Sequence, residues 1–143
     1  MRLSSNFLSY SNCNAVDENG LSREISTTLI AAWLISSFGH LQFELESNNR
    51  EGARSVEQRH TDRIWVIDPR SIEAARRREI IDAFFRLPYP VRTDLRPELQ
   101  PELVVLDTLI SEELARLIPD LVASRLLEEV WERLHELHEA RNH

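Results

Sequence analysis

A stripe of apolar residues between Ile25 and Leu41 limits most strongly how this chain can fold. Its members recur mostly at steps of three and four residues, the spacing that places side chains on one face of an α-helix: Ile25, Leu29, Ile30, Trp33, Leu34, Phe38 and Leu41. The stripe predicts a long helix with one broad buried face, weakened or bent at Gly39. Residues 41–46 alternate apolar and polar side chains, which fits either a continued helix or a strand. We expect the helix to continue to about Leu45.

Two shorter segments have the composition of β-strands. Ile64–Ile67 is apolar and is closed by Asp68-Pro69. Leu3–Tyr10 carries aromatic and apolar residues and precedes a stretch rich in Asn, Asp, Ser and Gly. Between the long helix and Ile64–Ile67, the composition of Ser47–Gly52 predicts a polar loop.

Helical periodicity returns in the second half of the chain. We expect helices over Ile72–Leu87, capped by Ser71 or Asp68, from about Glu102 to Leu117, and after Pro119-Asp120. The last two are expected to form a helical hairpin. The sequence thus predicts a mainly helical α+β fold with a long helix, a short β element and a C-terminal helical hairpin.

A chain of 143 residues is expected to form a single domain. Within it, residues 1–70 would form a helix-loop-strand unit and residues 71–143 a helical support. Cys13 is the only cysteine, which excludes an internal disulfide and fits a reducing cytoplasm. The longest apolar run, Leu29–Phe38, is far shorter than the ~20 residues of a membrane span, so we expect no membrane partner.

Charge is distributed unevenly along the chain. All 17 basic residues are arginines, and the net charge is −7. Arg50–Arg78 contains eight arginines and five acids, a local balance of +3, whereas Glu79–His143 has fourteen acids and seven arginines. A basic middle permits a local anionic partner despite the overall sign.

No catalytic device is recognisable in the sequence. The three glycines, Gly20, Gly39 and Gly52, are too scattered for a phosphate-binding loop. His135 and His138 are three residues apart instead of the four that a helical metal-binding pair requires, so a solvated amphipathic helix is the preferred interpretation over a metal site. We predict neither catalytic residues nor metal ligands in this chain.

The polar loop and the residues after it carry side chains suited to nucleic acid. Asn, Gln and Arg can bind base edges, and Arg and Ser can bind phosphates. On composition alone an exposed loop of mixed charge is the simpler explanation, and Arg76–Arg78 are best explained as a solvated helix face, with phosphate contact as the alternative. The candidate DNA-binding residues are Asn48, Asn49, Arg50, Arg54, Ser55, Gln58, Arg59 and His60.

Three phrases of the sequence resemble the target-recognition region of N6-adenine DNA methyltransferases from restriction-modification systems. They are LISSFG at Leu34–Gly39, GARS at Gly52–Ser55 and WVIDP at Trp65–Pro69. In that family a helix with a similar phrase precedes a glycine-containing loop, a basic segment, a short strand and a further helix. The C-terminal helices also resemble the helical tail of the same enzymes.

The resemblance implies a module that binds DNA without modifying it. Asn48–His60 would then face DNA, with Arg54 as the best single candidate. Ile35 departs from the family, which usually has asparagine there. The sequence also has no Asn-Pro-Pro-Tyr-like motif for a flipped adenine, since Leu87–Pro90 reads LPYP, and no glycine-rich loop for S-adenosylmethionine.

The first hypothesis is therefore a DNA target-recognition or accessory module of an adenine-specific methyltransferase or restriction-modification enzyme. Its partners would be DNA and a methyltransferase catalytic subunit or domain, which would carry S-adenosylmethionine. The alternative is a helical protein-interaction module without DNA binding, which self-associates through its C-terminal helices. Its basis is an apolar seam on the last helix, formed by Leu127, Val130, Leu134 and Leu137.

Overall fold

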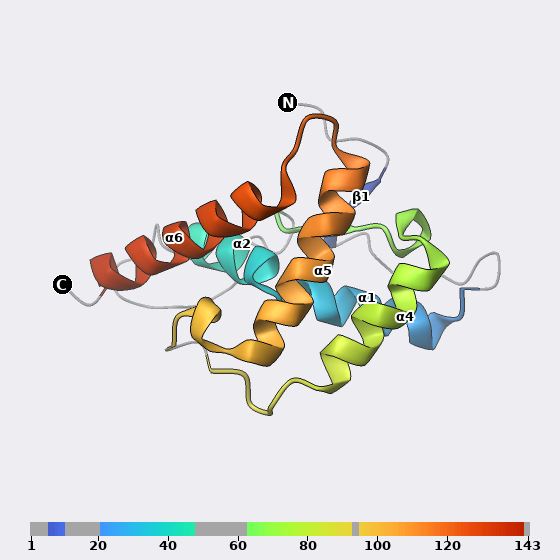
Figure 1. The fold of residues 1–143 in the computed structure, drawn as a ribbon, viewed down its shortest axis with the longest axis horizontal. Helices are drawn as coiled ribbons and strands as arrows, with labels where there is room; N and C mark the ends of the chain where they lie inside the picture. Colours follow the sequence, from blue (N-terminus) through green and yellow to red (C-terminus); the bar gives the residue numbers. More distant parts are fainter. Residues whose placement is uncertain (1–5, 11–20, 48–62, 93–94, 142–143) are drawn as a thin grey trace.

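A computed structural model describes residues 6–10, 21–47, 63–92 and 95–141. The described part is mainly helical with a small sheet (Figure 1), which confirms the predicted fold class. Its elements are β1 (Phe7–Ser9), α1 (Arg23–Ile35), α2 (Ser37–Ser47), β2 (Trp65–Ile67), α4 (Ala74–Phe85), α5 (Pro101–Leu117) and α6 (Ala123–Arg141). Short 3-10 turns lie at Pro69–Ser71 and Pro97–Leu99.

The two short strands form one antiparallel pair. Each is shorter than the segment expected from the sequence, Leu3–Tyr10 and Ile64–Ile67 respectively. A backbone hydrogen bond from the Asp68 N–H to the Asn6 carbonyl, 2.8 Å long, continues the pairing past the strand ends. The register aligns Phe7 with Ile67, Leu8 with Val66 and Ser9 with Trp65.

The helical prediction for residues 25–45 is confirmed, but the structure divides this segment into α1 and α2 at Ser36. Ser36 has extended backbone with ψ 168°, and its hydroxyl donates to the Trp33 carbonyl at 2.6 Å. The Asp107 carboxylate accepts hydrogen bonds from the Ser37 N–H at 2.9 Å and the Ser37 hydroxyl at 2.5 Å. A carboxylate at a helix start satisfies unpaired N–H groups and favours the positive end of the helix dipole. Asp107, from α5, thus stabilises a break that lies three residues before Gly39.

Gly39, expected to bend the helix, has a different role in the first turn of α2. A β-carbon at this position would lie 2.6 Å from the Leu34 Cα and from the Trp33 carbonyl oxygen, and closer still to the Leu34 carbonyl oxygen. The missing side chain therefore lets α2 start in close contact with the last turn of α1.

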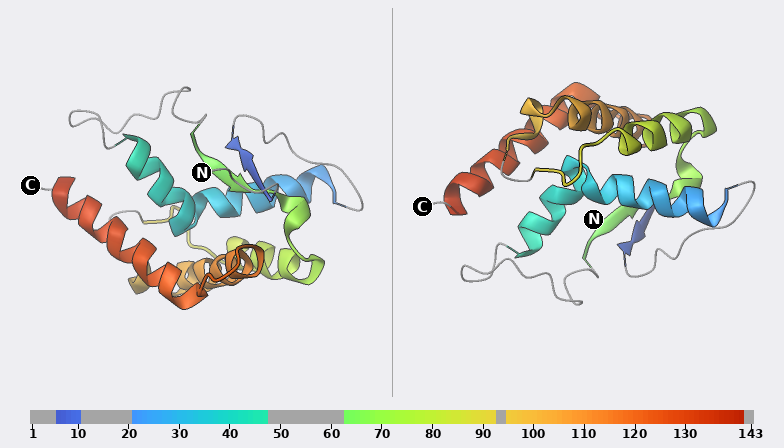
Figure 2. Two further views of the ribbon diagram at one scale, coloured as in Figure 1. Left: turned by 90° about the horizontal axis from the view of Figure 1, so that it is seen from above. Right: turned by 90° about the horizontal axis from the view of Figure 1, so that it is seen from below.

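Helix α1 lies between the two-stranded sheet on one side and the α4 and α5 layer on the other (Figure 2). Helix α6 packs against both α5 and α2. Apolar side chains from all these elements join in one buried cluster, so residues before and after position 70 share a core. Its most buried members include Leu29, Ala32, Val66, Leu106 and Leu134.

The helix expected over Ile72–Leu87 is α4, which begins two residues later. Its N-cap is Glu73, whose side chain makes no capping hydrogen bond, so the predicted capping by Ser71 or Asp68 was wrong. Asp68 caps the preceding 3-10 turn instead, by accepting a hydrogen bond from the Arg70 N–H at 2.9 Å.

The last two helices follow the predicted order, with a turn at Pro119-Asp120 and the final helix starting at Ala123. No helix within the described residues is long and apolar enough to cross a bilayer. The apolar seam that suggested self-association packs inside the chain, against α5 and α2. Its four members are 2–6% exposed: Leu127, Val130, Leu134 and Leu137.

Candidate functional site

The predicted DNA-binding residues all fall within positions 48–62, which lie outside the described residues. They are Asn48, Asn49, Arg50, Arg54, Ser55, Gln58, Arg59 and His60. The structure does describe the two ends of this segment, Ser47 at the end of α2 and Arg63 just before β2. The geometry of these ends determines where the segment can be presented.

A hydrogen-bonded clamp holds α2 against β2 beside those two ends. The Gln42 side-chain amide accepts a hydrogen bond from the Trp65 N–H and donates one to the Trp65 carbonyl, both at 2.8 Å. The same carbonyl accepts a third bond from the Trp33 indole N–H, also at 2.8 Å. The Gln42 amide thus makes the two hydrogen bonds to the Trp65 backbone that a neighbouring strand would make.

The chain re-enters the described structure at Arg63, close to the end of α2. One Arg63 guanidinium nitrogen lies 3.7 Å from a Glu46 carboxylate oxygen, while the Arg63 side chain remains 72% exposed. The next residue, Ile64, is fully buried. The described residues on either side of segment 48–62 therefore meet at one edge of the molecule, through Glu46 and Arg63.

The start of α2 is fixed by a buried polar network around Asp107. Besides Ser37, the Asp107 carboxylate accepts a hydrogen bond from the Trp131 indole N–H at 2.9 Å, which links α2, α5 and α6. Asp107 is fully buried, and this burial raises its pKa above the ordinary 3.8, although hydrogen bonds from Ser37 and Trp131 act in the opposite direction.

The second half of α2 is fixed to α6 through Glu44, which is 3% exposed. Its carboxylate pairs with Arg141 through Oε2, while Oε1 lies 3.1 Å from His40 Nε2 and 3.8 Å from His138 Nε2. His40, Glu44 and His138 each offer one donor atom, and all three atoms lie within 4.8 Å of one another, so this trio could hold a metal ion.

The sequence predicts His135 and His138 as one solvated pair, and the structure separates their roles. His135 pairs with Glu139 at 3.2 Å on the outer part of α6, as a solvated helix would. His138 instead contacts a buried glutamate of α2. The sequence contains one local signal, the His40 and Glu44 spacing of four residues, but nothing in it connects that pair to His138.

Two of the three consecutive arginines on α4 are bound within the chain, contrary to the expected solvated face. Arg76 Nη1 lies 3.1 Å from a Glu112 carboxylate oxygen. Arg77 Nε donates to the Pro69 carbonyl at 3.2 Å. Of this group only Arg78 keeps an exposed position on the helix.

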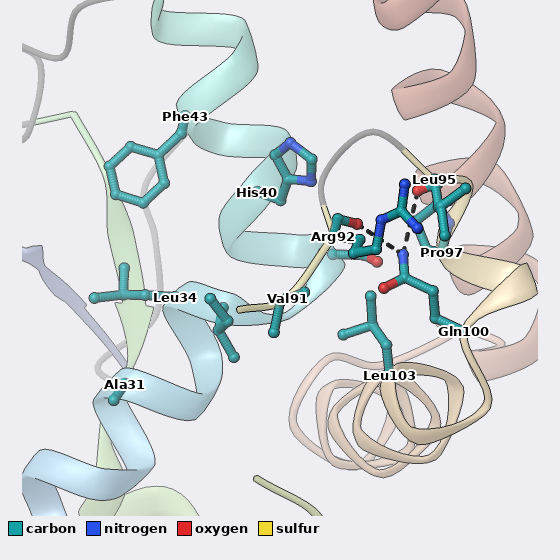
Figure 3. A pocket seen from close by; sticks show the side chains of 12 residues that line it. Ala31, Leu34, His40, Phe43, Val91, Arg92, Leu95, Pro97, Gln100 and Leu103 are labelled. Carbon is teal, nitrogen blue, oxygen red and sulfur yellow. Dashed lines mark hydrogen bonds between the residues drawn. The ribbon is translucent and has the colours of Figure 1, made fainter. Parts of the chain in front are cut away.

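A cavity of about 430 Å³ opens between α1, α2 and the segment before α5 (Figure 3). Its walls are mainly apolar, with Ile35 among the lining residues. Ile35 stands where the resembled family usually has asparagine, so in this chain that position contributes to an apolar wall. At one side of the cavity, Gln100 donates hydrogen bonds to the carbonyls of Arg92 and Leu95, at 2.9 and 3.2 Å (Figure 3).

Comparison with known proteins gave one result that bears on function. A family model described as "Restriction endonuclease BpuSI, specificity domain" matches residues 1–86. The match covers β1, α1, α2, β2, α4 and the predicted DNA-binding segment, and ends before α5 and α6. It confirms the predicted resemblance to a target-recognition region of restriction-modification proteins. No curated protein and no solved structure gave a significant match.

Proposed function

This chain belongs to the family of the BpuSI restriction endonuclease specificity domain, and on that premise we propose that it is a DNA target-recognition module of a restriction-modification enzyme. The observation that carries the proposal is the extent of the family match. Residues 1–86 include both the arginine-bearing segment 48–62 and the elements that hold its two ends.

The elements that flank the segment, α2 and β2, suit target recognition. Sequence-specific contacts need side chains presented to base edges from a scaffold that fixes their position. Here α2 is fixed at its start by Asp107, in its middle by Gln42 and near its end by Glu44. We infer that segment 48–62 presents its Asn, Gln and Arg side chains from this fixed edge.

The distribution of arginines also supports segment 48–62 as the DNA-binding site. Arg70, Arg76 and Arg77 are engaged within the chain by carboxylates and backbone carbonyls. Arg63 is largely exposed at the edge of the segment, beside Arg50, Arg54 and Arg59 in the sequence. We infer that these four arginines supply the phosphate and guanine contacts, since guanidinium groups bind both bidentately.

The methyltransferase assignment extends the proposal one step further. The motifs that resemble N6-adenine methyltransferases lie within the residues matched by the family model, and the chain carries neither an adenine-pocket motif nor a cofactor loop. We infer that S-adenosylmethionine and the reacting adenine are bound by a separate catalytic domain or subunit. The helices α5 and α6, which lie beyond the family match, are the candidate docking elements for it.

The proposal is tested by comparing the DNA binding of two variants that each lose two arginines, one in segment 48–62 and the other on α6. Fluorescence anisotropy with duplex DNA is measured over a range of salt concentrations, for the chain alone and with a candidate catalytic partner. Changing Arg54 and Arg59 together to Ala should weaken binding at least about tenfold and lower the salt slope by about one for each phosphate that no longer binds an arginine. Changing Arg125 and Arg133 together, on α6, removes the same charge and should leave the affinity of the chain alone within about twofold.

Two outcomes contradict separate parts of the proposal. Equal affinities of the two double variants would show that segment 48–62 is not the DNA-binding site. Absence of salt-dependent binding by the unmodified chain, both alone and with the partner, would rule out the recognition function itself.

A further inference from the structure

We propose that His40, Glu44 and His138 form a binding site for a divalent transition-metal ion of the zinc type. His40 and Glu44 lie one turn apart on α2, and His138 comes from α6, which packs beside α2 (Figure 1). Both imidazole Nε2 atoms approach the same carboxylate oxygen, Glu44 Oε1, at 3.1 and 3.8 Å.

The donor set and its spacing fit such an ion. Two imidazole nitrogens and one carboxylate oxygen are a common protein donor set for zinc, and imidazole also suits nickel and copper. Metal–ligand bonds of about 2.0–2.1 Å in a tetrahedral arrangement place neighbouring donor atoms about 3.3 Å apart. The two measured separations bracket that value, and the whole set spans at most 4.8 Å. Small side-chain rotations are sufficient to bring the three atoms onto one ion.

Arg141 occupies the position of an outer-shell partner. It binds Glu44 Oε2, which leaves Oε1 directed at the two histidines. Metal-bound carboxylates are commonly oriented by a hydrogen bond of this kind. The competing explanation is a buried glutamate neutralised by Arg141 alone, with the histidines as ordinary hydrogen-bond donors. The two explanations differ in one measurable property, the specific uptake of a metal ion.

The two histidines of the trio also line a cavity, whereas Glu44 lies behind them. A cavity of about 270 Å³ is lined by His40 and His138 together with Pro97, Leu134, His135 and Glu139. A fourth ligand such as water could reach the ion from this side, as in zinc sites with three protein ligands. The bound ion would tie α2, which leads directly into segment 48–62, to the last helix of the chain. This inference does not depend on DNA binding.

The test uses the full chain, stripped of metal with a chelator, and Zn²⁺ or Co²⁺ alone as the probe. Calorimetric titration should give one ion per chain, and saturating Zn²⁺ should raise the Tm. His138→Ala should weaken Zn²⁺ binding more than about tenfold and remove most of the rise in Tm. This residue lies near the end of α6 with a quarter of its side chain exposed, and circular dichroism checks that the variant folds.

His135→Ala is the matched control, because His135 lines the same cavity but lies outside the trio. It should bind Zn²⁺ within about twofold of the unmodified chain. Co²⁺ absorption provides a second readout, since Glu44→Gln should change the visible spectrum while His135→Ala should not. The proposal is overturned if the unmodified chain takes up no stoichiometric ion, or if His138→Ala and His135→Ala affect binding equally.

Discussion

The side-chain amide of Gln42 binds the backbone of Trp65 in both directions, with two hydrogen bonds of 2.8 Å. This contact joins α2 to β2 across the two ends of segment 48–62. The amide pairs with the peptide group much as a neighbouring strand would. The stability of the contact between α2 and β2 and the placement of the proposed recognition segment therefore depend on the same side chain.

Gln42→Glu should damage this clamp while leaving side-chain size almost unchanged. The carboxylate can still accept from the Trp65 N–H, but its second oxygen would face the Trp65 carbonyl without a proton between them. We expect a loss of about 1–3 kcal/mol in the free energy of unfolding, measured by urea denaturation, and faster hydrogen exchange of the Trp65 amide. Glu46→Gln, on the same helix, should change stability by less than about 0.5 kcal/mol because its ion pair with Arg63 is long, at 3.7 Å, and the Arg63 side chain is largely exposed. Equal effects of the two changes would contradict the clamp.

Gly39→Ala should be strongly destabilising because the added methyl group meets backbone that cannot rotate away. The nearest atoms are the Leu34 Cα, the Leu34 carbonyl oxygen and the Trp33 carbonyl oxygen. We expect a loss of about 3 kcal/mol, by chemical or thermal denaturation, although alanine is the better helix former. Thr27→Ala on the exposed side of α1 is the control and should stay within about 0.5 kcal/mol. A neutral or stabilising Gly39→Ala would show that α1 and α2 are farther apart than described.

Local sequence signals were sufficient for the types of most described elements. Steps of three and four residues indicated the helical segments, and the apolar run Ile64–Ile67 indicated β2. The break at Ser36 could not be predicted, because the carboxylate that stabilises it belongs to Asp107, seventy residues after its hydrogen-bond partner Ser37. The sequence shows the low helix propensity of Gly39, but the importance of this residue comes from the close packing of two helix ends.

Contacts between residues far apart in the sequence also explain which features of the candidate sites the sequence did not predict. The helical spacing of Leu134 and Leu137 places both on one apolar face of a helix. It does not show whether that face packs against another subunit or against the same chain. The sequence predicts a solvated His138 because its partner Glu44 lies on a different helix. Residue type and family resemblance predict the arginines of segment 48–62 as DNA-binding residues, and the DNA-binding experiment tests this prediction.

Asp107→Asn should destabilise the junction of α2, α5 and α6. An amide could replace the carboxylate toward Ser37, but its NH₂ group would then face the Trp131 indole N–H, leaving two donors opposed. Since the site is fully buried, we expect a loss of about 1–3 kcal/mol in the free energy of unfolding. Asp82→Asn, an exposed acid on α4, makes the same chemical change and should have an effect below about 0.5 kcal/mol. Matching losses in the two variants would contradict the network.

The stability difference between the unmodified chain and Asp107→Asn should also depend on pH, with a sign fixed by the raised pKa of Asp107. Burial raises this pKa in the folded state above the ordinary 3.8, so the folded chain holds the proton more tightly than the unfolded chain does. The stabilising contribution is therefore fully present below the unfolded-state pKa and is lost as the pH rises through the folded-state pKa. Urea denaturation of both proteins from about pH 3.5 to about pH 8, in buffer containing EDTA, should show the advantage of the unmodified chain decreasing and then levelling off. An advantage that instead grows with pH would mean that the hydrogen bonds from Ser37 and Trp131 outweigh burial, and that Asp107 is held as the carboxylate.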